Sequence, residues 1–229
     1  MTGRGRAIRA RGRRDVRSER VVGVRNWKDI DWDEPRPSIE ELVGSWASVD
    51  WEPVPINLPA LDAYLRQIRE THSNGGYLIG RWRAVRCPDV TAWFAARNRL
   101  GEYEMHRLLF ENPVVRTELS SLEIPVPLDR VPGSLKEVPG GVLTLDGILA
   151  TIIVHGGAYK SFQGSAAEAK RLADEAVADL TGRRYEDFRL DRTHEPWTPW
   201  FFGVAWDDTL VLTDYRSAEM TVLCLTDTD

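Results

Sequence analysis

The sequence predicts an α+β protein, in which a mostly antiparallel sheet with a C-terminal three-stranded meander is packed by an amphipathic helix and an N-terminal helical portion. The last 35 residues alternate between the two faces of a chain in the way that strands do. Residues 165–182 have the pattern of a helix instead, because Ser165 and Glu168 have capping-box spacing and Gly182 can end the helix.

The meander is predicted from three apolar segments joined by short links, residues 200–206, 209–214 and 220–226. Short links favour antiparallel neighbours. The turn at Asp207 and Asp208 and the terminus at Asp227 and Asp229 then lie at the same end of the sheet. We therefore expect four carboxylates to gather there, as solvated turn and tail groups or as a site that attracts positive charge.

Two functional hypotheses follow from this acidic cluster. The first is a cytoplasmic, non-catalytic binding protein, in the style of bacterial immunity or accessory proteins, whose acidic surface engages a basic macromolecular partner. This binding protein is expected to need no cofactor. The alternative is a divalent-metal-assisted hydrolase of phosphate-containing substrates, with Mg²⁺ or Ca²⁺ as the metal. In that alternative the metal is held by Asp207, Asp208 and Asp227, and His155 or His194 acts as acid or base.

The rest of the chain supplies the predicted helices and a hairpin. We expect a helix capped by Ser38, helices over 58–70 and 89–110, and a strand over 77–84. Glu102 and His106, four residues apart in the third helix, are expected to form a surface ion pair. Asp146 and Gly147 predict a hairpin turn within 142–155. The proline-rich stretch 124–140 is a candidate soft boundary inside a single domain of residues 23–229.

A glycine-rich loop precedes the helix that begins near Ser165. Gly157, Lys160, Gly164 and Ser165 combine backbone N–H groups, a cation and a helix N-terminus, which together suit a phosphate or another anion. The other interpretation is that the glycines serve a tight turn into the helix.

Composition limits the classes of protein to consider. The 229 residues are 42% hydrophobic and 28% charged, which is typical of a globular protein, and no run of about 18 apolar residues occurs. Cys87 and Cys224 have no metal or redox spacing, so we expect a reduced, cytoplasmic protein.

Charge divides the chain into two parts. Residues 1–20 hold eight Arg against two acids, a net +6, so the total of −5 leaves −11 for residues 21–229. Residues 1–22 are therefore expected to form a disordered basic arm. Clustered Arg can neutralise phosphate, so nucleic-acid binding through this arm is a second alternative function.

The C-terminal third also carries a resemblance. The capping box at 165–168, the segments WTPWFFGVAWDDTLVLTD and TVLCLTDTD, and the order in which they occur resemble uncharacterised bacterial proteins that end in a Trp/Phe-rich sheet and a Thr-Asp-Thr-Asp tail. The resemblance spans about residues 160–229. It implies a bacterial origin and a folded C-terminal unit, and it implies no catalytic residue.

Overall fold

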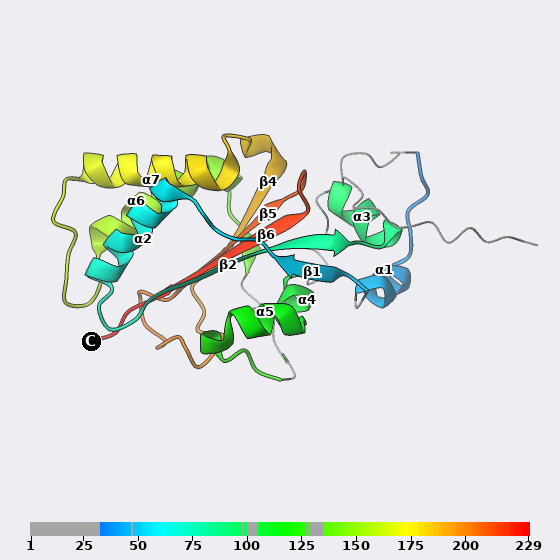
Figure 1. Ribbon diagram of the computed structural model, residues 1–229, viewed down its shortest axis with the longest axis horizontal. Helices are drawn as coiled ribbons and strands as arrows, with labels where there is room; N and C mark the ends of the chain where they lie inside the picture. The colour runs from blue at the N-terminus through cyan, green and yellow to red at the C-terminus, as the bar shows by residue number, and fades with distance from the viewer. Residues whose placement is uncertain (1–32, 47, 98, 100–104, 127, 129–134) are drawn as a thin grey trace, which may run out of the picture.

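The computed structural model describes residues 33–229 except 47, 98, 100–104, 127 and 129–134. The predicted basic arm (1–22), Glu102 and part of the proposed boundary at 124–140 therefore lie outside the described residues. Within them the chain folds around one six-stranded sheet, with helices on both of its faces (Figure 1). The predicted α+β class is confirmed.

All neighbouring strands are antiparallel, in the order β1-β2-β6-β5-β4-β3. The C-terminal meander consists of β4, β5 and β6, and β2 joins it along the outer side of β6. The strands are β1 (Asp50–Pro53), β2 (Gly76–Arg86), β3 (Lys136–Glu137), β4 (Phe188–Thr193), β5 (Asp208–Asp214) and β6 (Glu219–Thr226).

Every residue of β5 and β6 is buried, because helices or loops cover both faces of the central sheet. Leu210 and Leu212 pack with α2, α6 and α7 on one face, whereas Val211 packs on the other face with α3, α4 and α5. The helices are α1 (Ile39–Trp46), α2 (Pro59–Thr71), α3 (Asp89–Ala96), α4 (Met105–Glu111), α5 (Pro113–Glu118), α6 (Leu145–His155) and α7 (Ala166–Thr181).

Several predicted elements are confirmed by the structure. They are the helix over 58–70 (α2), the strand over 77–84 (β2), and the segments 209–214 and 220–226 (β5 and β6). The capping box of α7 forms between Ser165 and Glu168, and Ser38 caps α1 through its bonds with Glu41. None of the helices described here is both long enough and apolar enough to cross a membrane.

The prediction of a strand over 200–206 is wrong. This segment is a loop, and β4 takes its place as the first strand of the meander. Its backbone folds back on itself, with N–H groups of Gly203 and Val204 donating to the Asp207 carboxylate. The alternating aromatic residues mimic a strand, although Phe201 packs into the core from an irregular backbone.

The predicted hairpin over 142–155 is also wrong, because this segment forms a short 3₁₀ turn and then α6. The buried side chains Leu145, Leu149 and Ile153 recur every four residues and face α2 and α7. A continuous apolar run does not distinguish a buried strand from a buried helix, and tertiary packing overrides the β-branched residues here. The predicted single helix over 89–110 is divided into α3 and α4.

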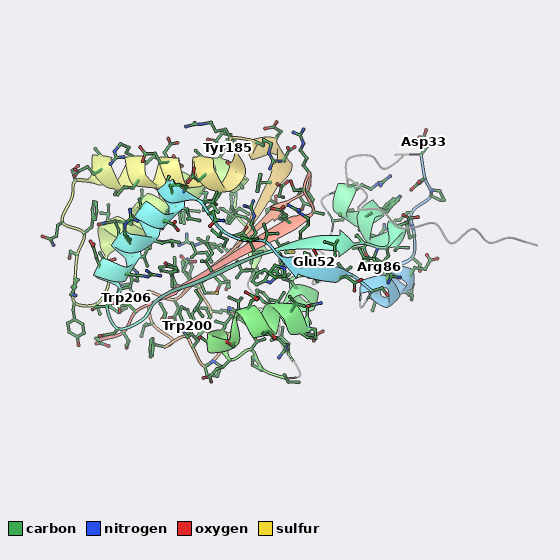
Figure 2. The ribbon with its side chains drawn as sticks, in the orientation of Figure 1. Asp33, Glu52, Arg86, Tyr185, Trp200 and Trp206 are labelled. Carbon is green, nitrogen blue, oxygen red and sulfur yellow. The ribbon has the colours of Figure 1, made fainter. Side chains whose placement is uncertain are left out.

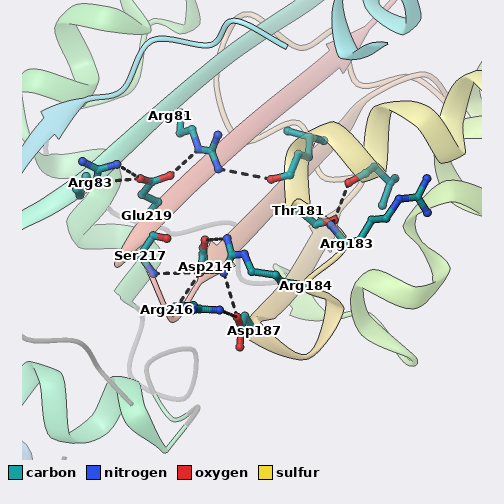
Figure 3. Close-up of polar contacts among 12 residues, drawn as sticks. Arg81, Arg83, Thr181, Arg183, Arg184, Asp187, Asp214, Arg216, Ser217 and Glu219 are labelled. Carbon is teal, nitrogen blue, oxygen red and sulfur yellow. Dashed lines mark hydrogen bonds and ion pairs between the residues drawn. The ribbon is translucent and has the colours of Figure 1, made fainter. Parts of the chain in front are cut away.

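Two buried carboxylates face each other at the β5–β6 hairpin, where Asp214 and Glu219 are cross-strand neighbours (Figure 3). Arginine side chains compensate both. Arg184 donates to Asp214 at 2.6 Å, and Arg81 lies 2.8 Å from Glu219, which Arg83 also contacts. Burial alone would raise the pKa of Asp214, but the hydrogen bonds from Arg184 and from the backbone hold that pKa below its ordinary value.

We expect the Asp214→Asn variant to lose about 2–4 kcal/mol of unfolding free energy at pH 7, because Arg184 loses a buried partner. Since the folded-state pKa of Asp214 is depressed, its contribution is present above about pH 4 and is lost as the pH falls through the folded pKa. The variant should therefore also lose stability less steeply on acidification. Urea unfolding at pH 7 and pH 3 checks this, with the exposed Asp174→Asn as control; equal effects of the two substitutions would contradict it.

Candidate functional site

Asp207 is a buried structural group that fixes the loop before β5. Its carboxylate accepts hydrogen bonds from the backbone N–H of Gly203 at 2.7 Å and of Val204 at 3.1 Å. The Thr226 hydroxyl donates to it at 2.5 Å, and Asp207 is only 1% exposed. Each oxygen therefore has a donor within the protein.

Asp227 performs the same role for two other segments. Its carboxylate accepts from the backbone N–H of Asn74 at 2.8 Å and of Ala158 at 2.7 Å, and the residue is fully buried. The loops after α2 and α6 are thus tied to the end of β6. Asp229, in contrast, is exposed at the terminus.

Asp208 is the third of these carboxylates and is 4% exposed. It pairs across β4 and β5 with the Arg192 guanidinium, whose Nε lies 3.0 and 3.1 Å from its two oxygens. Asp208 is also in register with Leu225, two residues before Asp227, so the predicted gathering at one end of the sheet is observed.

The acidic cluster nevertheless differs from the expectation. Asp207, Asp208 and Asp227 are buried and engaged by internal donors, so they do not form an exposed acidic surface. Among the described residues, no group of three His, Cys, Asp or Glu side chains is placed to hold a metal ion. Asp207, Asp208 and Asp227 are therefore not grouped as the ligands of one Mg²⁺ or Ca²⁺ ion in this arrangement.

Backbone N–H groups in the glycine-rich loop and at the start of α7 donate to carboxylates of the protein itself, and an external anion at Gly157, Lys160, Gly164 and Ser165 stays a prediction. Ala158 N–H donates to Asp227, while Gly157 N–H donates to the Lys160 carbonyl. At the start of α7, Ser165 N–H donates to Glu168 at 2.6 Å. The hydrogen bonds from the backbone and side chain of Ser165 lower the pKa of Glu168. Gly164 lies before this capping box, where a Cβ would meet the Phe162 ring and the Glu168 carboxylate.

A cavity of about 420 Å³ lies at the same end of the sheet as the buried carboxylates, and we call it the histidine pocket. It combines His155 from the end of α6, His194 from just after β4, and His72 from the end of α2. Figure 2 shows Trp206 at this end of the molecule, whereas Trp200 lies farther along toward α5. The lining residues are His72, Thr151, Ile152, His155, Gly156, Arg192, His194, Ala205, Trp206 and Asp208.

The polar groups of the histidine pocket differ in their burial and in the hydrogen-bond partners that they already have. The Arg192–Asp208 pair forms part of the wall, and His194 Nδ1 lies 3.2 Å from the Asp207 carbonyl oxygen. His72 is 3% exposed, and its Nδ1 lies 2.9 Å from the Thr71 hydroxyl. Burial lowers the pKa of His72 although the Asp227 carboxylate opposes this effect, which favours a neutral imidazole at pH 7.

The structure thus brings together part of the predicted site. His155, His194 and Asp208 line one pocket, whereas Asp207, Asp227 and Lys160 do not. His72, Arg192 and Trp206 were not predicted. Arg192 meets Asp208 only through the β4–β5 register, which no local pattern in the sequence reveals.

His106 occupies a different environment from the other three histidines. It is buried on the α4 side of the sheet, 3.4 Å from Asp191, to which Arg189 also donates. The prediction of a surface ion pair between Glu102 and His106 is therefore wrong in one respect, because His106 is only 4% exposed.

Comparison with known proteins adds no assignment. No protein-family model, no curated protein and no solved structure matches this chain.

The contact between Gly157 and Asp227 can be tested by adding a methyl group. A Cβ at position 157 would lie 2.1 Å from Asp227 Oδ2 and 2.4 Å from the Thr71 carbonyl oxygen, whereas a Cβ at Gly44 meets nothing within 4 Å. We expect Gly157→Ala to cost at least about 1–3 kcal/mol of unfolding free energy. Gly44→Ala, inside α1, should be neutral or stabilising by up to about 1 kcal/mol. Thermal or urea unfolding of both variants measures the two effects. If Gly157→Ala left the unfolding free energy unchanged, the close contact between this loop and Asp227 would be contradicted.

Proposed function

We propose that this protein is a non-catalytic binding protein and that the histidine pocket takes a small anionic ligand with an apolar, planar part. One observation carries the proposal: three of the four histidines, from three separate elements, line one cavity together with an arginine and a tryptophan. A volume of about 420 Å³ lies in the range of small-molecule sites.

The polar lining favours an anion. Arg192 is the permanent cation of the wall, and it shares its charge with Asp208. His155 and His194 are both exposed at the pocket, so their imidazole N–H groups can donate to a carboxylate or phosphate. A ligand cation would instead have to compete with Arg192 for the one carboxylate present.

The apolar lining favours a flat ring. Ile152 and Ala205 supply aliphatic surface, and the partly buried Trp206 supplies an aromatic face. Aromatic pairs in stacked or edge-on arrangements add to the free energy of area burial. A benzoate-like or phenyl-phosphate-like molecule combines both requirements.

This proposal keeps the predicted class of binding protein and changes the way in which it binds. The acidic-surface hypothesis named Asp207, Asp208, Asp227 and Asp229, and only Asp229 is exposed. Of the hydrolase hypothesis, the sharing of one pocket by His155, His194 and Asp208 remains, but no set of three His, Cys, Asp or Glu side chains among the described residues is placed to hold a metal.

Histidine-selective NMR tests the proposal directly. In a titration with phenyl phosphate, the ring resonances of His72, His155 and His194 should shift with one common Kd, while His106 serves as internal control on the other face of the sheet. The uncharged analogue phenol should bind more weakly. His155→Gln and His194→Gln should each weaken binding by about 2- to 10-fold, the value of one hydrogen bond.

The matched control is Lys160→Gln, which removes an exposed cation outside the histidine pocket. If Lys160→Gln weakens binding as much as the histidine variants, the attraction is a general effect of charge. Equal shifts at His106 and the pocket histidines, or no shift at millimolar phenyl phosphate, would refute the proposed pocket.

A further inference from the structure

His72 has a ring nitrogen without a partner at the wall of the histidine pocket. The residue is the C-cap of α2, is only 3% exposed and lines the cavity. Its Nδ1 lies 2.9 Å from the Thr71 hydroxyl, whereas no group among the described residues forms a hydrogen bond or an ion pair with its Nε2. Unlike the indole nitrogen of Trp82, this unpartnered Nε2 is not sealed from solvent. Because His72 lines the histidine pocket, a molecule in that pocket can reach Nε2.

The partner of Nδ1 decides which ring nitrogen of His72 carries the proton. The Thr71 hydroxyl has one hydrogen, and its oxygen lies 2.9 Å from the Gln67 carbonyl oxygen, which can only accept. The hydroxyl therefore donates to Gln67 and accepts from His72, so Nδ1 is the protonated nitrogen. In a neutral imidazole the other nitrogen then keeps a free lone pair. Nε2 of neutral His72 is thus a hydrogen-bond acceptor.

Burial keeps the imidazole of His72 neutral at pH 7. It lowers the pKa of His72, although the Asp227 carboxylate and the Ile68 carbonyl oppose this effect. The backbone N–H of His72 also donates to the Ile68 carbonyl at 2.7 Å, so both the backbone and the ring are held in place. His155 and His194 are exposed and can gain or move a proton through water. His72, in contrast, offers a lone pair at a fixed position.

We propose that His72 makes the histidine pocket selective for ligands that carry a hydrogen-bond donor in addition to an anionic group and a ring. This inference rests on the function proposed above and names its ligand class, the hydroxyaryl carboxylates. The carboxylate binds beside Arg192, and the hydroxyl group donates to His72 Nε2. Asp208 is another acceptor of the wall, but both of its oxygens already pair with Arg192. An aryl carboxylate without the hydroxyl would displace water from Nε2 and leave a buried acceptor unpaired, which weakens binding.

Calorimetric titration of the full-length protein with benzoate, 3-hydroxybenzoate, 4-hydroxybenzoate and 4-methoxybenzoate tests the proposed selectivity. We expect at least one hydroxybenzoate to bind about 2- to 10-fold more tightly than benzoate, the value of one hydrogen bond. The methoxy compound has an oxygen at the same position but no donor, so it should bind no more tightly than benzoate. An equal gain from the methoxy group would assign the effect to ring substitution and overturn the inference.

Variants assign the preference to one side chain. His72→Phe keeps a flat ring and removes the acceptor, so the difference between benzoate and the hydroxybenzoates should disappear. His72→Gln restores a side-chain carbonyl oxygen and should recover part of that difference. The matched control is His155→Gln, which changes another imidazole of the same pocket. It should weaken benzoate and the hydroxybenzoates alike and leave their ratio of Kd values unchanged.

The position of the proton can be measured without any ligand. In protein labelled with ¹⁵N-histidine, long-range ¹H–¹⁵N correlations at pH 7 should show a protonated Nδ1 and an unprotonated Nε2 for His72, assigned through His72→Phe. A proton on Nε2, or benzoate that binds as tightly as both hydroxybenzoates, would overturn the inference and leave the proposed function standing. If none of the four compounds shifts the resonances of His72, His155 and His194, the proposed function fails and the selectivity fails with it.

Discussion

The buried carboxylates at the two ends of the central strands constrain the segments around them, because a charge removed from water must be compensated by nearby donors. At one end Asp207 and Asp227 obtain those donors from loop backbones, and at the other Asp214 and Glu219 obtain them from arginines. The loops cannot move without uncovering a carboxylate. These four buried carboxylates therefore hold neighbouring segments of the chain in place through hydrogen bonds and ion pairs.

The hydrogen bonds of Asp207 and Asp227 also shape the histidine pocket. Asp227 holds the loops after α2 and α6, next to His72 and His155, while Asp207 holds the loop that contains Trp206. The Arg192–Asp208 pair closes the wall between them. Groups from distant parts of the chain are thus fixed around one cavity by backbone hydrogen bonds, so the cavity is formed without any bound molecule.

The edge of β2 has a different origin, since it depends on backbone N–H groups that proline residues do not have. Pro53 at the end of β1 and Pro55 just after it have no N–H group, so pairing with β2 stops near Trp82. Proteins generally protect such edges, and the charged residues Asp50 and Glu52 on β1 are protection of this kind. The protection ends where β1 ends, at Pro53 opposite Trp82.

Features that depend on neighbouring residues could be predicted from the amino-acid pattern: the α+β class, the capped helix α7, the helix α2 and the strands β5 and β6. It indicated His155 and His194 as functional candidates and placed Asp208 and Asp227 at one end of the sheet. Long-range packing, in contrast, makes 200–206 a loop and 142–155 a 3₁₀ turn followed by α6, and it buries Asp207, Asp208 and Asp227 among internal donors. The reason is physical: capping and periodicity act within a few residues, whereas the partner of a carboxylate and the choice between a buried strand and a buried helix are set by segments far away in the chain.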